Sequence, residues 1–413
     1  MTEYDDQGAF GNPDGSREEF DRFVLLAKGG NDTNPSYIDA GIKHRVIVGA
    51  KGAGKTLYMR KMKALAEDNE SIVVIKEPNH IPSTETILSV HKTHDDNIRT
   101  ETWQIIWRRA IFLSVASLFY AKHEKDNKLN ITLRVERDEF LDTFNKLVCS
   151  NFTTPQSIFS QLGAIVTRYG QSAGRLKAYL DDPEWDSFET ILVRLINSAP
   201  PIVYFIDALD EEFRHAPSAW LDLQKGLFYQ VMRLLRDSEL GGRLHIVICV
   251  RDLVYSSVLQ SEHGARYIAD EHIKLLHWSR SAAKEFLKIK VSMLSPRYFI
   301  NKNKEKTLEN FVGYIEIENK KRRVTECLED YILRHTKYFP RDIINIGNQL
   351  CKEIEIAGFC RQGINPLKLS ASVSAISSII AQEGISICGN HLATSTLPNH
   401  AMRQEILEEY QNN

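Results

Sequence analysis

Eight consecutive residues, from Gly49 to Thr56, read GAKGAGKT and match the phosphate-binding pattern GxxxxGK[ST]. The glycines at positions 49, 52 and 54 let the backbone curl so that several N–H groups converge on one anion. Lys55 is then expected to contact the β- and γ-phosphates of a nucleotide, and Thr56 to offer its hydroxyl to Mg²⁺. The expected nucleotide-binding residues in this segment are Gly49, Ala50, Lys51, Gly52, Ala53, Gly54, Lys55, Thr56 and Leu57.

The sequence on either side of this motif supplies the setting that phosphate binding needs. An apolar strand-like run, residues 44–48, precedes the motif, and a helical pattern, residues 57–66, follows it. A helix that starts at the end of the glycine loop points the positive end of its dipole at the phosphates. The alternative is a glycine-rich turn without a ligand, and the flanking strand and helix argue against it.

A second chemical signal is the segment from Pro201 to Glu212, PIVYFIDALDEE. An apolar strand that ends in a carboxylate beside a phosphate loop can hold a Mg²⁺-bound water, and Asp207 has this position. Asp210 and Glu211 follow closely, and either carboxylate could orient or deprotonate the attacking water. Without the phosphate motif upstream, such a segment would be an ordinary exit from a strand into a loop.

Two arginines are candidates for sensing the γ-phosphate. Arg251 follows the strand-like run 244–250 and should leave the sheet at the same edge as the glycine loop. Arg341 follows Pro340, which favours the first turn of a helix and is expected to start one here. Each arginine has a simpler alternative: Arg251 could be a surface residue paired with Asp252, and Arg341 an ordinary helix-start residue. The expected catalytic residues are Lys55, Asp210, Glu211 and Arg251.

Continuous apolar runs separated by helical patterns predict the fold class. The runs at 44–48, 71–75, 202–206 and 244–250 lack polar alternation, as expected for strands that are buried on both faces. We therefore expect an α/β fold of the P-loop NTPase type, with three layers and a mostly parallel sheet. The stretch from 78 to 198 has helical patterns throughout and is expected to be an insertion between the second and third strands.

Three regions follow from these patterns. Residues 1–36 form an N-terminal segment that we expect to be partly disordered, with one helix at 17–28. Residues 37–291 form the nucleotide-binding core with its helical insertion, and residues 292–413 form a helical lid or C-terminal domain. Helices are expected at 103–120, 281–293 and 324–335, a lysine-rich connection at 301–323, and only a weak helical pattern beyond residue 363.

Composition narrows the class of protein. The 413-residue chain has 52 basic and 54 acidic side chains and a net charge of −2, so no overall field attracts a polyanion, and nucleic acid is not indicated as a partner. The longest apolar run, 110–121, is shorter than the roughly 20 residues of a membrane span. The N-terminal residues resemble neither a signal peptide nor a transit peptide. Six scattered cysteines without a CxxC pair favour reduced thiols and a cytoplasmic location.

The segments GAKGAGKT, FIDALDEE and VICVRD together resemble the motifs of bacterial STAND and related AAA-like P-loop ATPases. Two more segments, IKLLHWSRSAAKEFLKIKV and FPRDIINIGNQL, look like the element after the last sensor strand and the start of the lid helix in that group. The resemblance covers about residues 40–350. It implies that Asp207 binds magnesium and that Asp210 or Glu211 is the catalytic acid. It also implies that Arg251 is a first sensor and Arg341 a second.

Proteins of this group usually act as nucleotide-driven switches that assemble or release an effector, often in prokaryotic signalling or antiviral defence. The chain departs from the group where Ala208 replaces a common glycine, and in its long insertion at 78–198. The sequence contains no array of ligand-sensing repeats and no nuclease, protease or TIR-like signature. An effector would therefore be another polypeptide.

The sequence thus predicts a Mg²⁺-dependent ATPase that acts as a regulatory switch, as a homo-oligomer or with a separate effector protein, and without a membrane. Adenine is expected by default, because no NKxD-type guanine signature follows an apolar strand. Two other classes remain open: a nucleic-acid-handling ATPase of the replication-initiator or transposition-regulator kind, and a small-molecule kinase. Hydrolysis stimulated by DNA would favour the first, and a phosphorylated acceptor the second.

Overall fold

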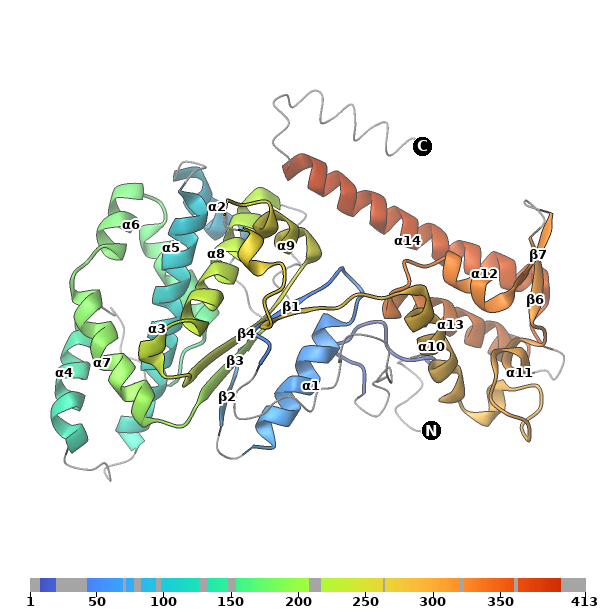
Figure 1. Cartoon of the computed structure of the whole chain (residues 1–413), viewed down its shortest axis with the longest axis horizontal. Coiled ribbons are helices and arrows are strands. Elements are labelled where there is room, and N and C mark those ends of the chain that lie inside the picture. The colour runs from blue at the N-terminus through green and yellow to red at the C-terminus, as the bar shows by residue number, and fades with distance from the viewer. Residues whose placement is uncertain are drawn as a thin grey trace. The chain divides into compact units, whose positions relative to one another are not determined.

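Five parallel strands, in the order β2-β3-β4-β1-β5, form the main sheet of the computed structural model (Figure 1). The strands are β1 (Val46–Val48), β2 (Val73–Lys76), β3 (Ile202–Ile206), β4 (Leu244–Val250) and β5 (Ile273–Leu275). The four strands predicted from apolar runs are confirmed, with starts two residues later for β1 and β2. The short strand β5 was not predicted, because its three residues, IKL, form no apolar run.

The structure describes residues 8–19, 43–69, 72–77, 83–93, 98–125, 132–147, 154–207, 217–262, 264–319, 323–359 and 363–394. Of the helix predicted at 17–28, only residues 17–19 are among these, and they are not helical. No helix in the described ranges is both long enough and apolar enough to cross a lipid bilayer.

The strand order places β4 between β1 and β3. Val48 of β1 lies opposite Val250 of β4, and Ile206 of β3 lies opposite Ile248. The connection from β1 to β2 crosses the sheet in one direction, whereas the later connections cross in the other direction. Because parallel crossovers are right-handed, the two sets of connections cover opposite faces of the sheet. The carboxyl end of β1 is therefore a topological switch point, where open α/β sheets bind their ligands.

The helices of the insertion build a large apolar core on one face of the sheet. Alternate strand residues, such as Tyr204 and Ile248, are buried against this core together with Trp103 of α3 (Arg99–Lys125). α3 runs beside α8 (Pro217–Leu235), as Figure 1 shows. Gly226 of α8 permits the close approach, because a Cβ at this position would lie 2.5 Å from the Cβ of Trp103.

The other described helices of the insertion confirm that it is helical. They are α2 (Thr84–Thr93), α4 (Thr132–Leu147), α5 (Ile158–Tyr169), α6 (Ala173–Leu180) and α7 (Glu184–Ser198). After β4, a short helix, α9 (Asp252–Leu259), leads towards β5.

The chain divides into two compact units. The glycine-loop unit comprises Met1–Pro35, Gly49–Lys61 and Leu275–Asn413, and the sheet unit comprises Ser36–Val48 and Met62–Lys274. The division falls within α1 (Lys55–Glu67), the helix that follows the glycine loop. The domain boundaries expected from the sequence, after residues 36 and 291, stay predictions.

The C-terminal part of the glycine-loop unit is mainly helical. Its longer elements are α10 (Arg280–Ser292), α12 (Leu328–Arg334), α13 (Pro340–Ile356) and α14 (Pro366–Thr394), with the short helix α11 (Leu308–Val312) and the hairpin β6 (Glu316–Asn319) and β7 (Val324–Cys327). Buried residues of α10, α12 and α13 share one apolar core. Pro340 starts α13 as predicted, with Phe339 as its N-cap.

Two sequence predictions in this region are wrong in part. The helix predicted at 324–335 begins only at Leu328, because Val324–Cys327 pairs antiparallel with Glu316–Asn319. The lysine-rich stretch, predicted as a connection, contains α11 and β6. The weak helical pattern beyond residue 363 corresponds to α14, which has 29 residues.

Candidate phosphate-binding site

The glycine loop, residues 49–54, joins β1 to α1. β1 ends at Val48 and α1 begins at Lys55, so the loop lies between a buried strand and a helix N-terminus. Gly52 and Gly54 have φ angles of 89° and 96°, a region that side chains with a Cβ rarely adopt. The loop is closed by a hydrogen bond from Ala53 N to the Ala50 carbonyl. Glycine is therefore required at these two positions by the backbone itself.

Lys55, the first residue of α1, folds back over the loop. Its ammonium group donates to the carbonyls of Gly49 and Ala50, over 2.8 and 3.1 Å. The residue is only 8% exposed. These two acceptors use two of the three ammonium protons, so a third can be donated to an anion.

The loop can accommodate a phosphate group. A Cβ built on Gly54 would meet no atom within 4 Å, so open space lies beside the loop at that glycine. A Cβ on Gly49 would lie 3.2 Å from the Cβ of Ala53, so the backbone there is closely approached. Open space, a buried cation and a helix N-terminus are the features that bind phosphate in such loops. The residues present therefore fit a nucleotide phosphate.

Arg341, the predicted second sensor, contacts the glycine loop. Its backbone N–H donates to the Gly52 carbonyl over 3.4 Å. Its Cβ would lie 3.1 Å from a Cβ built on Gly52. The start of α13 is thus seated on the loop, and a larger residue at 52 would displace it.

A tryptophan that the sequence reasoning did not select also contacts the loop. Trp278 donates from Nε1 to the Ala53 carbonyl over 3.0 Å. Its ring packs edge-on against Phe286 of α10, with 5.4 Å between centroids. The tryptophan lies in the segment that resembles the element after the last sensor strand, but its type alone gives no sign of a loop contact.

An ion cluster on the loop was also missed. Lys51 Nζ lies 2.5 Å from Oε1 of Glu383 in α14, and Arg341 Nη1 lies 3.6 Å from the same oxygen. Partial burial would raise the pKa of the Glu383 carboxyl. The hydrogen bond from Lys51, with the charges of Lys51, Arg341 and Lys337, outweighs burial and holds this pKa below its usual value. Glu383 is therefore ionised at neutral pH.

The N-terminal residues 8–19 form a strap across α1 and α13. Phe10 is buried in the apolar core of the glycine-loop unit, and its backbone N–H donates to Asn348 Oδ1 over 2.8 Å. A Cβ on Gly347 would lie 2.3 Å from the ring of Phe10, so α13 needs glycine there. Asn348 Nδ2 donates back to the Gly11 carbonyl, over 2.8 Å. The strap is thus fastened to α13 by a buried ring and two hydrogen bonds.

The strap also reaches the start of α1. A Cβ on Gly15 would lie 3.2 Å from Leu57 N and 3.5 Å from the Cβ of Thr56. Arg60 of α1 donates to the carbonyls of Gly15 and Glu18, over 2.6 and 2.8 Å. Leu57 and Thr56 therefore have the strap as a neighbour. The expectation that residues 1–36 are partly disordered stays a prediction. A phenylalanine within a polar, glycine-rich stretch was the only sequence signal for this contact.

Asp207 and Arg251 belong to the sheet unit and follow neighbouring strands. Asp207 comes directly after β3, and Arg251 directly after β4, where it is the N-cap residue of α9. Both are half-buried at the carboxyl edge of the sheet. Asp210 and Glu211, the predicted catalytic carboxylates, lie outside the described residues.

A buried carboxylate occupies the same edge of the sheet. Glu77 follows β2 and accepts hydrogen bonds from the backbone N–H groups of Ile158 and Phe159, over 3.0 and 3.5 Å. Burial raises the pKa of Glu77 to about 7, although these two N–H groups act in the opposite direction. Glu77 holds the start of α5 against the sheet. It is not one of the predicted site residues.

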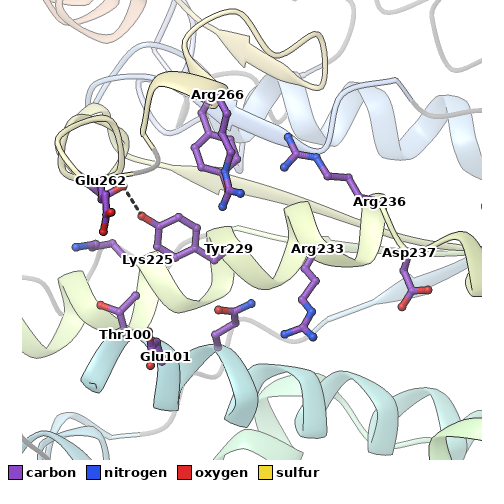
Figure 2. Close-up of a pocket in the computed structure, with 12 residues that line it drawn as sticks. Thr100, Glu101, Lys225, Tyr229, Arg233, Arg236, Asp237, Glu262 and Arg266 are labelled. Atoms are coloured by element: carbon purple, nitrogen blue, oxygen red, sulfur yellow. Dashed lines mark hydrogen bonds between the residues drawn. The ribbon is translucent and has the colours of Figure 1, made fainter. Parts of the chain in front are cut away.

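A separate groove of about 670 Å³ lies in the sheet unit. Figure 2 shows Lys225 and Glu262 towards one end and Arg233 and Asp237 towards the other. The lining has four basic side chains, Lys225, Arg233, Arg236 and Arg266, and three acidic ones, Glu101, Asp237 and Glu262. Arg236 is paired with Asp270 over 2.9 Å. The charges nearly balance, so the groove lacks the positive excess that a polyanion site requires.

Comparisons of the chain with models of protein families, with curated proteins and with solved structures find no match. Within the described ranges, no group of three or more histidine, cysteine, aspartate or glutamate side chains is arranged to hold a metal ion.

Proposed function

We propose that the chain binds ATP with Mg²⁺ at the glycine loop and hydrolyses it. The observation that carries the proposal is the arrangement of the loop. Two glycines with positive φ precede the N-terminus of α1, and the ammonium group of Lys55 is folded over the loop carbonyls. Backbone N–H groups at a helix N-terminus together with a buried lysine favour a multiply charged phosphate over other anions.

Each predicted residue has a role in this proposal. The Thr56 hydroxyl and the Asp207 carboxylate would hold Mg²⁺, which would neutralise the charge that develops on the phosphates. Asp210 or Glu211 would orient the attacking water, and Arg251 would sense the γ-phosphate from the end of β4. Lys55 would stabilise the transferred phosphoryl group, as donors aimed at developing charge do.

The contacts of the loop support a regulatory role for this ATPase. Arg341 of α13, Glu383 of α14 and Trp278 contact the loop or its side chains directly. A change in these contacts on nucleotide binding would be passed to the C-terminal helices. We therefore propose that nucleotide state controls self-association or the binding of a separate effector protein.

Hydrolysis by purified wild type, Lys55→Ala and Asp207→Ala tests the activity. With Mg²⁺ we expect both variants to lose roughly 100-fold or more in turnover, since each lacks one charged group that acts on the phosphates. Lys63→Ala is the matched control, because Lys63 also lies on α1 but pairs with Glu67. The control should keep its turnover.

Light scattering with ATP and with ADP tests the switch. A mass that changes between the two nucleotides in wild type, but not in Lys55→Ala, is the expected result. Turnover that persists in Lys55→Ala would contradict the proposed site. Turnover that rises only when DNA is added would instead favour the nucleic-acid-handling class.

A further inference from the structure

Glu383 is the acidic member of the ion cluster on the glycine loop. It lies on α14, whereas Lys51 belongs to the loop and Arg341 to the first turn of α13. The Lys51, Glu383 and Arg341 side chains are 30%, 26% and 29% exposed. One carboxylate therefore pairs with two cations at the position where the loop meets the C-terminal helices.

Both cations belong to residues that form or contact the glycine loop. Lys51 lies between the first two glycines of the motif, and Arg341 is in backbone contact with Gly52. The two ion pairs join two positive charges to one negative charge. Lys337, Asp342 and Asp14 also interact electrostatically with members of this cluster. A terminal phosphate group carries about −1.5 to −2 charges and more acceptor oxygens than a carboxylate. It is thus the stronger partner for the same two cations.

We propose that Glu383 is an internal competitor of the nucleotide, so that α14 is held to the glycine loop through Lys51 and Arg341 until a γ-phosphate takes these cations. This inference rests on the proposed ATP binding and adds the element that responds to it. Because coupling is reciprocal, a nucleotide that displaces Glu383 loosens α14. In turn, the ion pairs between Glu383 and the loop cations lower the affinity for nucleotide. ATP should compete better than ADP, because the γ-phosphate adds negative charge.

The size of the effect follows from the exposure of the cluster. Partly exposed ion pairs are weak, so the competition should be modest and reversible. We expect Glu383→Gln to tighten ATP binding on the order of 3- to 10-fold, with a smaller gain for ADP. Glutamine keeps the shape of glutamate and removes the charge, so the fold should be preserved.

Asp330→Asn is a matched control. Asp330 also pairs one carboxylate with a lysine and an arginine, Lys284 over 2.6 Å and Arg280 over 2.9 Å. Its side chain is 27% exposed, close to the 26% of Glu383. Asp330 lies on α12, and its two partners belong to α10. Removing its charge should leave nucleotide affinity unchanged.

The experiment measures ATP and ADP dissociation constants by calorimetry for wild type, Glu383→Gln and Asp330→Asn. Amide hydrogen exchange of α14 is measured in parallel for wild type and Glu383→Gln, with and without ATP. We expect tighter ATP binding only in Glu383→Gln. We also expect faster α14 exchange when ATP binds wild type, and exchange in Glu383→Gln that is fast without nucleotide.

Three outcomes distinguish the inference from the function on which it rests. Unchanged or weaker ATP binding in a folded Glu383→Gln overturns the competition, while ATP binding itself stands. Equal gains in Glu383→Gln and Asp330→Asn also overturn it, since a general loss of negative charge would then explain the gain. If neither wild type nor Glu383→Gln binds ATP or ADP, the proposed function fails, and the competition fails with it.

Discussion

The insertion core and the glycine loop are held in place by different kinds of contact. In the core, Phe188 stacks on Phe140 and Phe144, with 6.1 and 6.0 Å between centroids, and meets Trp185 edge-on at 5.6 Å. Around the loop, Trp278 and Arg341 each donate one hydrogen bond to a backbone carbonyl, and Lys51 belongs to a cluster of partly exposed charges.

Aromatic contacts in the insertion core and polar contacts at the glycine loop differ in whether a ligand can replace them. A buried aromatic cluster gains its stability from many apolar contacts at once, and no soluble ligand can replace them. A hydrogen bond or an exposed ion pair contributes only about 1 kcal/mol, so a phosphate can replace it. The insertion core is therefore suited to be a fixed frame, and the glycine loop to change its partners.

Phe188→Ala should have the largest effect, because it breaks the fixed frame. The loss of buried ring contacts and the resulting cavity should lower the free energy of unfolding by about 3–5 kcal/mol. Urea unfolding followed by tryptophan fluorescence measures it. Phe188→Leu retains most of the apolar volume and should lose clearly less. Small losses in both variants would mean that the core repacks around the change and is not a fixed frame.

Gly347→Ala tests whether the strap is packed as tightly as the core. The added methyl would lie 2.3 Å from the ring of Phe10, so the strap or α13 must shift. We expect a loss of about 2–3 kcal/mol in the free energy of unfolding. In a Phe10→Ala background the same change should cost little, because the obstructing ring is gone. Additive losses would show that Phe10 is not the obstacle.

The pH dependence of stability should reveal Glu77. Burial in the folded state raises the pKa of Glu77 from 4.5 to about 7. Between these two pH values the folded state therefore binds more protons than the unfolded state. The stabilisation that results from this pKa shift is fully present below about pH 4.5 and is lost as pH rises through about 7. We expect wild type to lose about 1–2 kcal/mol relative to Glu77→Gln over this range. Urea titrations at each pH measure the difference, and parallel curves would contradict it.

Trp278→Phe should have the smallest effect, because it removes one exchangeable contact at the loop. The variant loses the hydrogen bond from the indole N–H to the Ala53 carbonyl, while its phenyl ring can still pack against Phe286. We expect a loss of about 1 kcal/mol in the free energy of unfolding, measured by thermal or urea unfolding. Trp220→Phe is the comparison in the insertion core, because among the described residues Trp220 Nε1 has no acceptor. That variant should lose only packing. Trp278→Phe should change nucleotide affinity more than Trp220→Phe does, because Trp278 contacts the glycine loop. The opposite order would contradict the contrast between the two regions.

The elements that follow from local pattern were predictable. Unbroken apolar runs predicted β1 to β4, and Pro340 predicted the start of α13. Residues 324–327 were assigned to a helix because they continue the pattern of α12, whereas pairing with Glu316–Asn319 makes them a strand. α14 gave a weak pattern because apolar residues such as Leu367 and Ile379 are exposed, away from the buried residues Leu369 and Val373. Non-local pairing and helix packing decided these cases.

The sequence by itself determined the glycine loop, since its positive φ angles and the position of Lys55 depend on residue types a few positions apart. The tertiary structure alone decided which distant groups meet that loop. Phe10 and Asn348 are 338 positions apart, and no local pattern relates them. The chain has 54 acidic residues, and nothing in the type of Glu383 marks it as the partner of Lys51. Backbone sterics act over short stretches of chain, whereas the pairing of charges depends on the path of the whole fold.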